Sequence, residues 1–489
     1  MKRCCVWVLT VAVCLGAFAS AQAATEVRMA GDVRVYGNWF AHRDFTGWNK
    51  AGTKTEDCFE VWERFRLRTD FVANEAVKFR LGIKVENTWG YDTFTAANPT
   101  AAIQAEIAYL QFKLPGTDAE VTAGLQPVNL PQSSLFYNSV LWSGQMAALT
   151  VKVPLIPKTL SLLTGFGRLI DSNRTFDTTT TQVSDEFDAY FLTLPVTIEG
   201  FKATPWAMAS VAGRNANYAY KDTSDVAEWG NTFANTLFSA ASAKNMATPG
   251  AVGYWKNSQN PFIWAGGAFE VSALDPVRFY GDVIYGAGAM ADNKAASRKG
   301  WLIDAGFEYT GLETVTPQLF GFWSTGEDNS TRNGSERMPY MRSLWGPGNS
   351  FLFDNSQAFG KGSNMYVDPV GNYGIGASLK NIAFIDKLTN CLTFVYLRGN
   401  NAPRALRDAR ATLGNTYFAM GHDLTYNEYL VGLNFDTKYM IYENLAAIVE
   451  TGWSHGQFQE SVWGHRMVSR SEDNGNNAWK VAFGFTYKF

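Results

Sequence analysis

The feature that most constrains the fold is a period-two alternation of apolar and charged side chains over long segments. Residues 59–86 read "FEVWERFRLRTDFVANEAVKFRLGIKVE", two alternating arms joined by "ANEA". In the first arm Arg64 and Arg66 occupy one phase, while Phe65 and Leu67 occupy the other. Successive side chains of a strand point to opposite faces, so the pattern predicts a hairpin with one apolar and one charged face.

The same alternation recurs to the end of the chain and predicts about 18 strands, with 16 as the alternative count. Short connections alternate with long ones rich in Gly, Asn and Ser. The expected strands lie near residues 27–42, 58–72, 76–90, 101–114, 119–126, 147–154, 159–169, 184–197, 200–212, 260–273, 276–290, 299–311, 314–326, 370–383, 389–400, 427–440, 443–457 and 475–489.

An apolar face on every strand has two explanations, a second packed sheet or lipid. Rows of arginine beside a hairpin turn are unusual on the outer face of a sandwich, whereas a barrel in lipid turns them toward water. Hydrocarbon also requires that every backbone group be paired, which a closed barrel achieves. The chain has no run of 18 apolar residues after residue 23, so no spanning helix is expected. We therefore predict an all-β, transmembrane, antiparallel up-and-down β-barrel with short periplasmic turns, long outer loops and both termini in the periplasm.

The first 23 residues have the pattern of a secretory signal. Lys2 and Arg3 precede an apolar core, and "AQA" offers Ala21 and Ala23 as the small residues before a cleavage site. A lipoprotein signal at Cys14 is the alternative, disfavoured by the bulky Val13 before it. Residues 24–489 are then expected to form one barrel domain in the bacterial outer membrane.

The chain ends "WKVAFGFTYKF", an alternating strand that closes on Tyr487 and Phe489. This resembles the C-terminal signature of bacterial outer-membrane proteins, and the resemblance implies that these aromatics act as an assembly signal. Over residues 43–90, "RDFTGWNKAGTKTEDCFEVWERFRLRTDFVANEAVKFRLGIKVENTWG", the chain resembles the outer-membrane porins of Desulfovibrio-type bacteria. That resemblance is strongest over residues 24–126. It implies a homotrimer of water-filled barrels that pass small hydrophilic solutes.

Charged side chains on the polar phase are expected to line the lumen and to set selectivity, since basic rings favour anions. Acidic residues on later strands would face the basic wall and create a transverse field. The alternative is that Asp32, Asp70 and Glu86 neutralise the cations and that all these charges only solvate a wide pore. The predicted basic wall is Arg28, Arg34, Arg64, Arg66, Arg68, Lys78, Arg80 and Lys84, and the predicted acidic residues are Asp282, Asp304, Glu308 and Glu450.

Residues 127–146, "PVNLPQSSLFYNSVLWSGQM", are the candidate constriction loop. The segment follows the fifth strand, and in the general porins that this topology resembles the corresponding loop folds into the barrel. It contains no acid and no base, which argues against strong cation selectivity. Its apolar side chains are expected to anchor it to the inner wall, with a plug by another loop or a trimer contact as alternatives. The anchoring candidates are Leu130, Phe136, Tyr137 and Trp142.

The leading functional hypothesis is a passive porin that favours anions such as sulfate or organic acids. A surface-exposed structural or adhesive barrel is the alternative, because two loops at 213–259 and 327–369 are long enough to bind a partner. A barrel enzyme would need a Ser/His pair on the lipid face. The four histidines instead lie at or beyond the predicted outer ends of strands, without metal-ligand spacing, so we expect no enzyme, metal or cofactor. The formal net charge of −3 makes nucleic acid an improbable partner.

Overall fold

The structure is a computed structural model of the 489-residue chain. It describes residues 25–48, 58–91, 94–133, 138–171, 184–216, 218, 233–246, 257–341, 345–347, 351–353, 359, 365–414 and 417–489. The predicted signal and its cleavage residues Ala21 and Ala23 lie outside this part.

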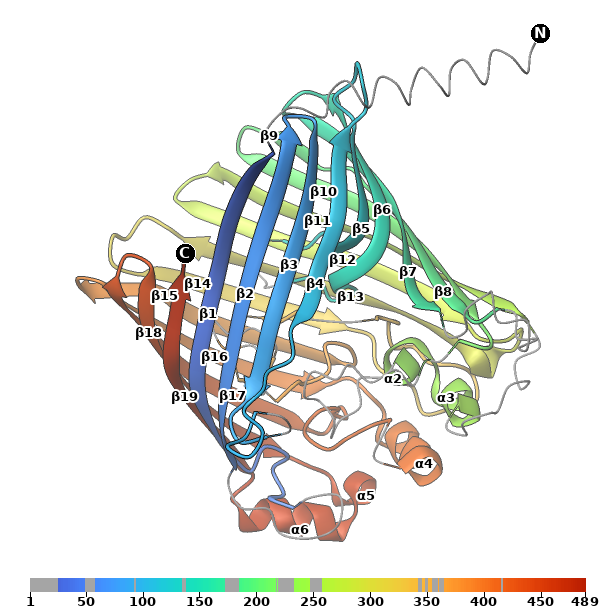
Figure 1. Ribbon diagram of the computed structural model, residues 1–489. Coiled ribbons are helices and arrows are strands. Elements are labelled where there is room, and N and C mark those ends of the chain that lie inside the picture. The colour runs from blue at the N-terminus through green and yellow to red at the C-terminus, as the bar shows by residue number, and fades with distance from the viewer. Residues whose placement is uncertain are drawn as a thin grey trace.

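The described chain is dominated by long antiparallel strands (Figure 1). The strands are β1 Glu26–Ala41, β2 Cys58–Asn74, β3 Val77–Thr88, β4 Gln104–Lys113, β5 Glu120–Asn129, β6 Ser143–Ile156, β7 Leu160–Asp171, β8 Glu186–Thr193, β9 Val196–Ile198, β10 Phe201–Gly213, β11 Gln259–Leu274, β12 Val277–Ala289, β13 Ser297–Tyr309, β14 Thr316–Ser324, β15 Asn372–Ile385, β16 Leu388–Gly399, β17 Tyr429–Tyr442, β18 Leu445–Gln457 and β19 Asn477–Lys488.

Two of these segments form a single strand of the barrel. β8 and β9 are separated only by Leu194 and Pro195, and both pair with β7 on one side and β10 on the other. Proline cannot donate to a ladder, which explains the interruption. The barrel therefore has 18 strands, as the alternation predicts, and not 16.

The barrel closes where β1 pairs with β19, from Asp32↔Lys488 to Ala41↔Trp479. Beyond that ladder, Gly31 N donates to Phe489 O at 2.9 Å and Phe489 N donates to Gly31 O at 3.1 Å. A side chain at position 31 would collide with the Phe489 ring, so the glycine makes room for the terminal aromatic. Closure removes the free sheet edges that hydrocarbon would not tolerate.

The outward face of the barrel is apolar and carries two aromatic belts. Trp301, Trp453 and Trp479 lie eight or nine residues from the ends of β13, β18 and β19 where the short turns are. Tyr309, Tyr442 and other exposed rings mark the opposite rim. Two such belts flanking an apolar band are the arrangement of a transmembrane β-barrel.

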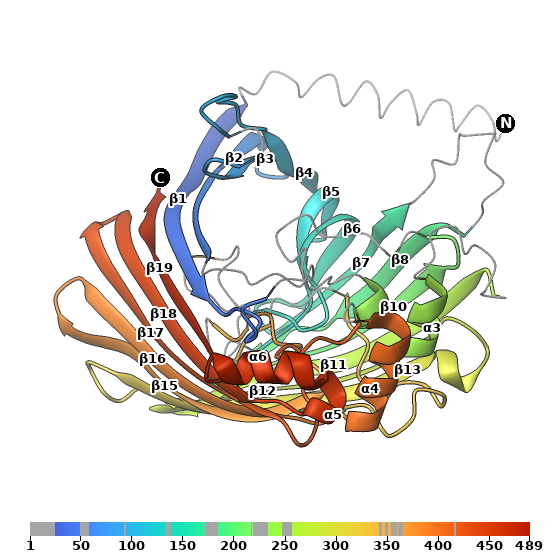
Figure 2. The same ribbon diagram turned by 90° about the horizontal axis from the view of Figure 1, so that it is seen from below.

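The two ends of the barrel differ, and we name them the turn end and the loop end. The turn end carries the short connections, such as residues 386–387 between β15 and β16. The loop end carries the long connections and all the described helices, several of which are visible on one side of that end in Figure 2. No helix in the described residues is long and apolar enough to span a membrane. The helices are α2 Phe233–Leu237, α3 Ala240–Met246, η1 Lys294–Ala296, α4 Pro403–Leu413, α5 Glu460–Trp463 and α6 His465–Asp473.

The predicted strand positions agree with the observed ones except around the candidate constriction loop. β5 continues to Asn129 and β6 begins at Ser143, because these residues pair with each other and Ser143 Oγ donates to Asn129 Oδ1 at 2.5 Å. The loop between the strands therefore covers residues 130–142, which is shorter than the predicted 127–146.

Candidate functional site

The predicted basic residues of β1–β3 share the phase of the barrel interior. On β1 and β2 that phase also carries Tyr36 and Trp62, which are buried together with Phe359 from a loop. The opposite phase carries exposed apolar residues such as Met29 and Phe71. The side chains of Arg34, Arg64, Arg66, Arg80 and Lys84 are 18–32% exposed, so water inside the barrel reaches them.

Carboxylates on the same phase pair with most of these cations. Asp32 accepts from Arg66 at 2.7 Å and from Arg64 at 3.3 Å, and lies 3.6 Å from Arg34. Asp70 accepts from Arg80 Nη2 at 2.7 Å. Lys84 Nζ lies 2.9 Å from Glu86. These pairs involve Asp32, Asp70 and Glu86, the acids that the sequence offers as neutralising partners of the cations. The wall therefore carries both charges, and its guanidinium groups outnumber its carboxylates.

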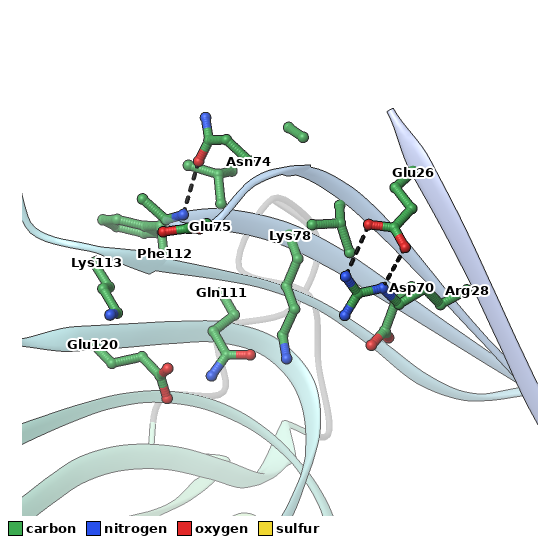
Figure 3. Close-up of a pocket in the computed structure, with 14 residues that line it drawn as sticks. Glu26, Arg28, Asp70, Asn74, Glu75, Lys78, Gln111, Phe112, Lys113 and Glu120 are labelled. Atoms are coloured by element: carbon green, nitrogen blue, oxygen red, sulfur yellow. Dashed lines mark hydrogen bonds and ion pairs between the residues drawn. The ribbon is translucent and has the colours of Figure 1, made fainter. Parts of the chain in front are cut away.

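A pocket of about 580 Å³ opens at the turn end of the same wall (Figure 3). Arg28 lines it and forms a two-point ion pair with Glu26, with 2.7 and 2.8 Å between the paired atoms. Lys78 lines it too, with Gln111 from β4. Charged and polar groups therefore continue from the interior of the barrel to its turn-end rim.

The described part of the loop, residues 130–133 and 138–142, reaches the opposite wall of the barrel. Gln132 Nε2 donates to Asp282 Oδ2 of β12 at 2.6 Å and to Asp304 Oδ2 of β13 at 3.3 Å. Ser133 N donates to Asp282 Oδ1 at 3.0 Å. Among the predicted anchors, Leu130 and Trp142 are buried, whereas Phe136 and Tyr137 lie outside the described residues. Gln132 was not among the predicted anchors, because an uncharged amide in a loop carries no signal of its own.

A second loop, which joins β14 to β15, also folds into the barrel. Trp345 Nε1 donates to Asp304 Oδ2 at 3.2 Å, and Phe359 stacks on Tyr36 with 4.4 Å between ring centroids. Met341 N donates to Leu141 O at 3.1 Å and joins the two loops. The sequence suggested this segment as an outer binding loop; Met341, Trp345 and Phe359 pack inside the barrel, whereas Asp328, Asn329, Arg332 and Asn333 are exposed.

The four predicted acidic residues face the interior but are buried. Asp282 and Asp304 are covered by Gln132, Ser133 and Trp345. Glu308 accepts from Lys380 at 3.0 Å and from the Tyr280 hydroxyl at 2.5 Å. Glu450 pairs with Lys480 at 2.8 Å, and both side chains are fully buried. Water therefore reaches the basic side of the interior, while loops and ion pairs cover these acids.

One buried cluster, Asp368, His422 and Asp423, has the composition of a metal site. Arg337 lies within it, 2.7 Å from Asp368 and 2.9 Å from Asp423. Burial opposes a charged His422, but its hydrogen bond to Asp423 leaves the pKa of the imidazole raised. Because the guanidinium supplies the positive charge that a metal would bring, the cluster is an ion-pair network that joins two loops.

Comparison with known proteins yields structural similarity only. No protein-family model and no curated protein matches the chain. Among solved structures, it is similar to Pseudomonas aeruginosa OccK11 (OpdR), with a TM-score of 0.51, 10% identity, and coverage of 95% of this chain and 96% of that one. It is also similar to Pseudomonas aeruginosa OccK8 (OprE), with a TM-score of 0.50, 9% identity, and coverage of 95% and 98%. At this level of identity the similarity establishes fold alone: the chain shares the closed β-barrel fold of these Pseudomonas aeruginosa proteins.

Proposed function

We propose that the protein is an outer-membrane porin through which small hydrophilic solutes diffuse passively, with a preference for anions. The observation that carries this proposal is the row of partly exposed cations inside the barrel along β1–β3. On the opposite side, loops and ion pairs cover the acidic candidates. A diffusing ion would therefore approach the basic wall through water. Protein groups would separate the same ion from Asp282, Asp304, Glu308 and Glu450.

The proposed physiological solutes are small anions such as sulfate or organic acids. The assembly that we propose is a homotrimer in the outer membrane, with a cleaved signal over residues 1–23 and with the turn end in the periplasm. Diffusion through such a barrel requires no chemical step and no cofactor. A structural or adhesive role is not favoured, because Trp345 and Phe359 of the β14–β15 loop are buried inside the barrel instead of lying on an outer surface.

The test is the reversal potential of purified protein in planar bilayers under a salt gradient. We expect anion selectivity, and we expect it to fall in the double variant Arg64→Gln/Arg66→Gln. Removing one positive charge 4 Å from a passing monovalent anion weakens their attraction by about 1 kcal/mol in water. The preference for anions over cations should therefore fall by at most about fivefold for each charge removed. The matched control is Arg404→Gln, because Arg404 is 68% exposed on α4, away from the basic wall. Cation selectivity of the unaltered protein would refute the proposed preference.

A further inference from the structure

Two carboxyl groups face each other inside the barrel, and we name Asp282 and Asp304 the carboxyl pair. They occupy directly opposite positions in the ladder between β12 and β13 and are 1% and 2% exposed. Gln132 Nε2 lies 2.6 Å from Asp282 Oδ2 and 3.3 Å from Asp304 Oδ2, so one amide group touches both. Like charges at opposite positions destabilise a sheet, and burial strengthens their repulsion. The carboxyl pair therefore needs a compensating positive charge, which either a proton or a cation can supply.

The protein itself supplies no such charge in the part of the chain that the structure describes. Elsewhere in the interior a buried acid has a basic partner, as Glu450 has in Lys480. No Lys, Arg or His nitrogen of the described residues lies within 4.0 Å of the carboxyl pair. The loop that covers the pair adds none, because residues 127–146 contain no charged side chain. Two ionised carboxylates in this position would be costly without a cation.

Buried oxygen atoms around the carboxyl pair are available as ligands. Asp304 Oδ1, Gln132 Oε1 and Ser133 Oγ are buried and form no hydrogen bond with any described group of the chain. Ser133 is 2% exposed, and its backbone N–H lies 3.0 Å from Asp282 Oδ1 and 3.1 Å from Asp282 Oδ2. These contacts hold the serine hydroxyl beside the pair. Carboxylate, amide and hydroxyl oxygens are the ligands that hard cations prefer.

The Gln132 amide suits either source of positive charge. In the structure it donates through Nε2, while its Oε1 has no partner among the described groups. A half-turn about the last bond of the side chain exchanges the two atoms, which have nearly the same shape. The carbonyl oxygen would then face both carboxyl groups and could bind a cation together with them. Gln132 is only partly buried, so the interior of the barrel reaches the pair from this side.

We propose that the carboxyl pair binds one Ca²⁺ ion together with Gln132 Oε1 and Ser133 Oγ. Ca²⁺ accepts about six to eight oxygen ligands in irregular shells, which suits a set divided between a rigid wall and a loop, whereas Mg²⁺ requires near-ideal octahedral geometry. The ion neutralises the pair and fastens the loop of residues 130–142 to the wall. Trp345 Nε1 donates to Asp304 Oδ2 at 3.2 Å, so the same ion steadies the β14–β15 loop. The site goes beyond the proposed ion preference and does not depend on which solute passes.

The experiment is equilibrium dialysis of the purified full-length protein against radioactive Ca²⁺, after treatment with EDTA. We expect one bound ion per chain. Asp282→Asn/Asp304→Asn keeps the shape of both side chains and removes both charges. Its affinity for Ca²⁺ should fall at least about tenfold, the least that even groups outside the shell of ligands contribute. The matched control is Asp328→Asn/Asp408→Asn, which removes two carboxylates from exposed positions and should leave the affinity unchanged.

A second pair of variants leaves the wall of the barrel intact. Ser133→Ala removes one proposed ligand oxygen and should weaken Ca²⁺ binding severalfold. Ser139→Ala removes a buried hydroxyl from the same loop, where Ser139 Oγ accepts from Leu141 N at 3.2 Å, and should not weaken it. Heat-modifiable mobility on gels verifies that each variant is folded. Equal affinities of the Ser133→Ala and Ser139→Ala variants would contradict the assignment of the serine ligand.

Two outcomes would overturn the site itself. If the unaltered protein binds no Ca²⁺ at either pH 7 or pH 9, a proton shared by the carboxyl pair supplies the charge. If Asp282→Asn/Asp304→Asn binds as tightly as the unaltered protein, the ion lies elsewhere. Conductance in planar bilayers is measured on the same preparations. Conductance without Ca²⁺ binding would refute the site and leave the channel proposal intact, whereas Ca²⁺ binding without conductance would refute the channel proposal alone.

Discussion

Glu327 is a buried carboxyl group in the loop that joins β14 to β15. Burial raises its pKa to about 7, against the opposing effects of the Ser335 hydroxyl and Arg337. An acid whose pKa is higher in the docked loop than in solvent binds an extra proton when docked. Docking is therefore strongest below the ordinary value of 4.5 and weakens as pH rises from there toward 7.

We expect the loop around Glu327 to open more readily at pH 8 than at pH 5, by at most ~1.4 kcal/mol for each pH unit within the titration window. Hydrogen exchange at the Ser335 and Arg337 amides, corrected for intrinsic rate, measures this. Glu327→Gln should abolish the pH dependence, while Asp328→Asn, at the exposed neighbouring position, should retain it. An unchanged pH dependence in Glu327→Gln would show that another group titrates.

The loop of residues 130–142 depends on two adjacent carboxylates of the facing wall. Asp282→Ala removes the acceptor of Ser133 N and the nearer of the two acceptors of Gln132 Nε2, which keeps only the 3.3 Å contact with Asp304. Each buried donor left unpaired costs about 1–3 kcal/mol, so the loop should leave the wall more often. We expect larger current fluctuations and an altered single-channel conductance in planar bilayers. Leu433→Ala, which changes only a lipid-facing side chain, is the control, and identical traces for both variants would contradict this role of Asp282.

The elements themselves were predictable because each strand repeats one simple pattern, apolar outward and polar inward. Arg64 and Asp70 fall on the interior phase as alternation requires. The folding of loops into the barrel was only partly predictable. Gln132 reaches Asp282 across 150 positions of sequence, and no local periodicity encodes such a contact. The four acids look like lumen charges in the sequence, and only the loops that cover them reveal their burial.

The closed barrel depends on the contact between its first and last strands. Gly31→Leu would place a side chain against the Phe489 ring and the Arg66 carbonyl at the junction. Overpacking of this kind costs about 1–3 kcal/mol, so we expect a lower fraction of folded barrel. Heat-modifiable mobility on gels measures that fraction. Gly267→Leu is the matched control, because a side chain there meets open space; equal folding of the two variants would contradict the proposed role of the junction.

The contacts of Asp32 determine how easily the ion selectivity of such a barrel can change. One carboxylate holds three arginines of the interior wall, at 2.7, 3.3 and 3.6 Å. A single-nucleotide change from Asp to Asn would release three planar donors at once for a passing oxyanion. A mutation in one codon would thereby change which solutes cross the cell envelope, while every strand of the barrel stays the same.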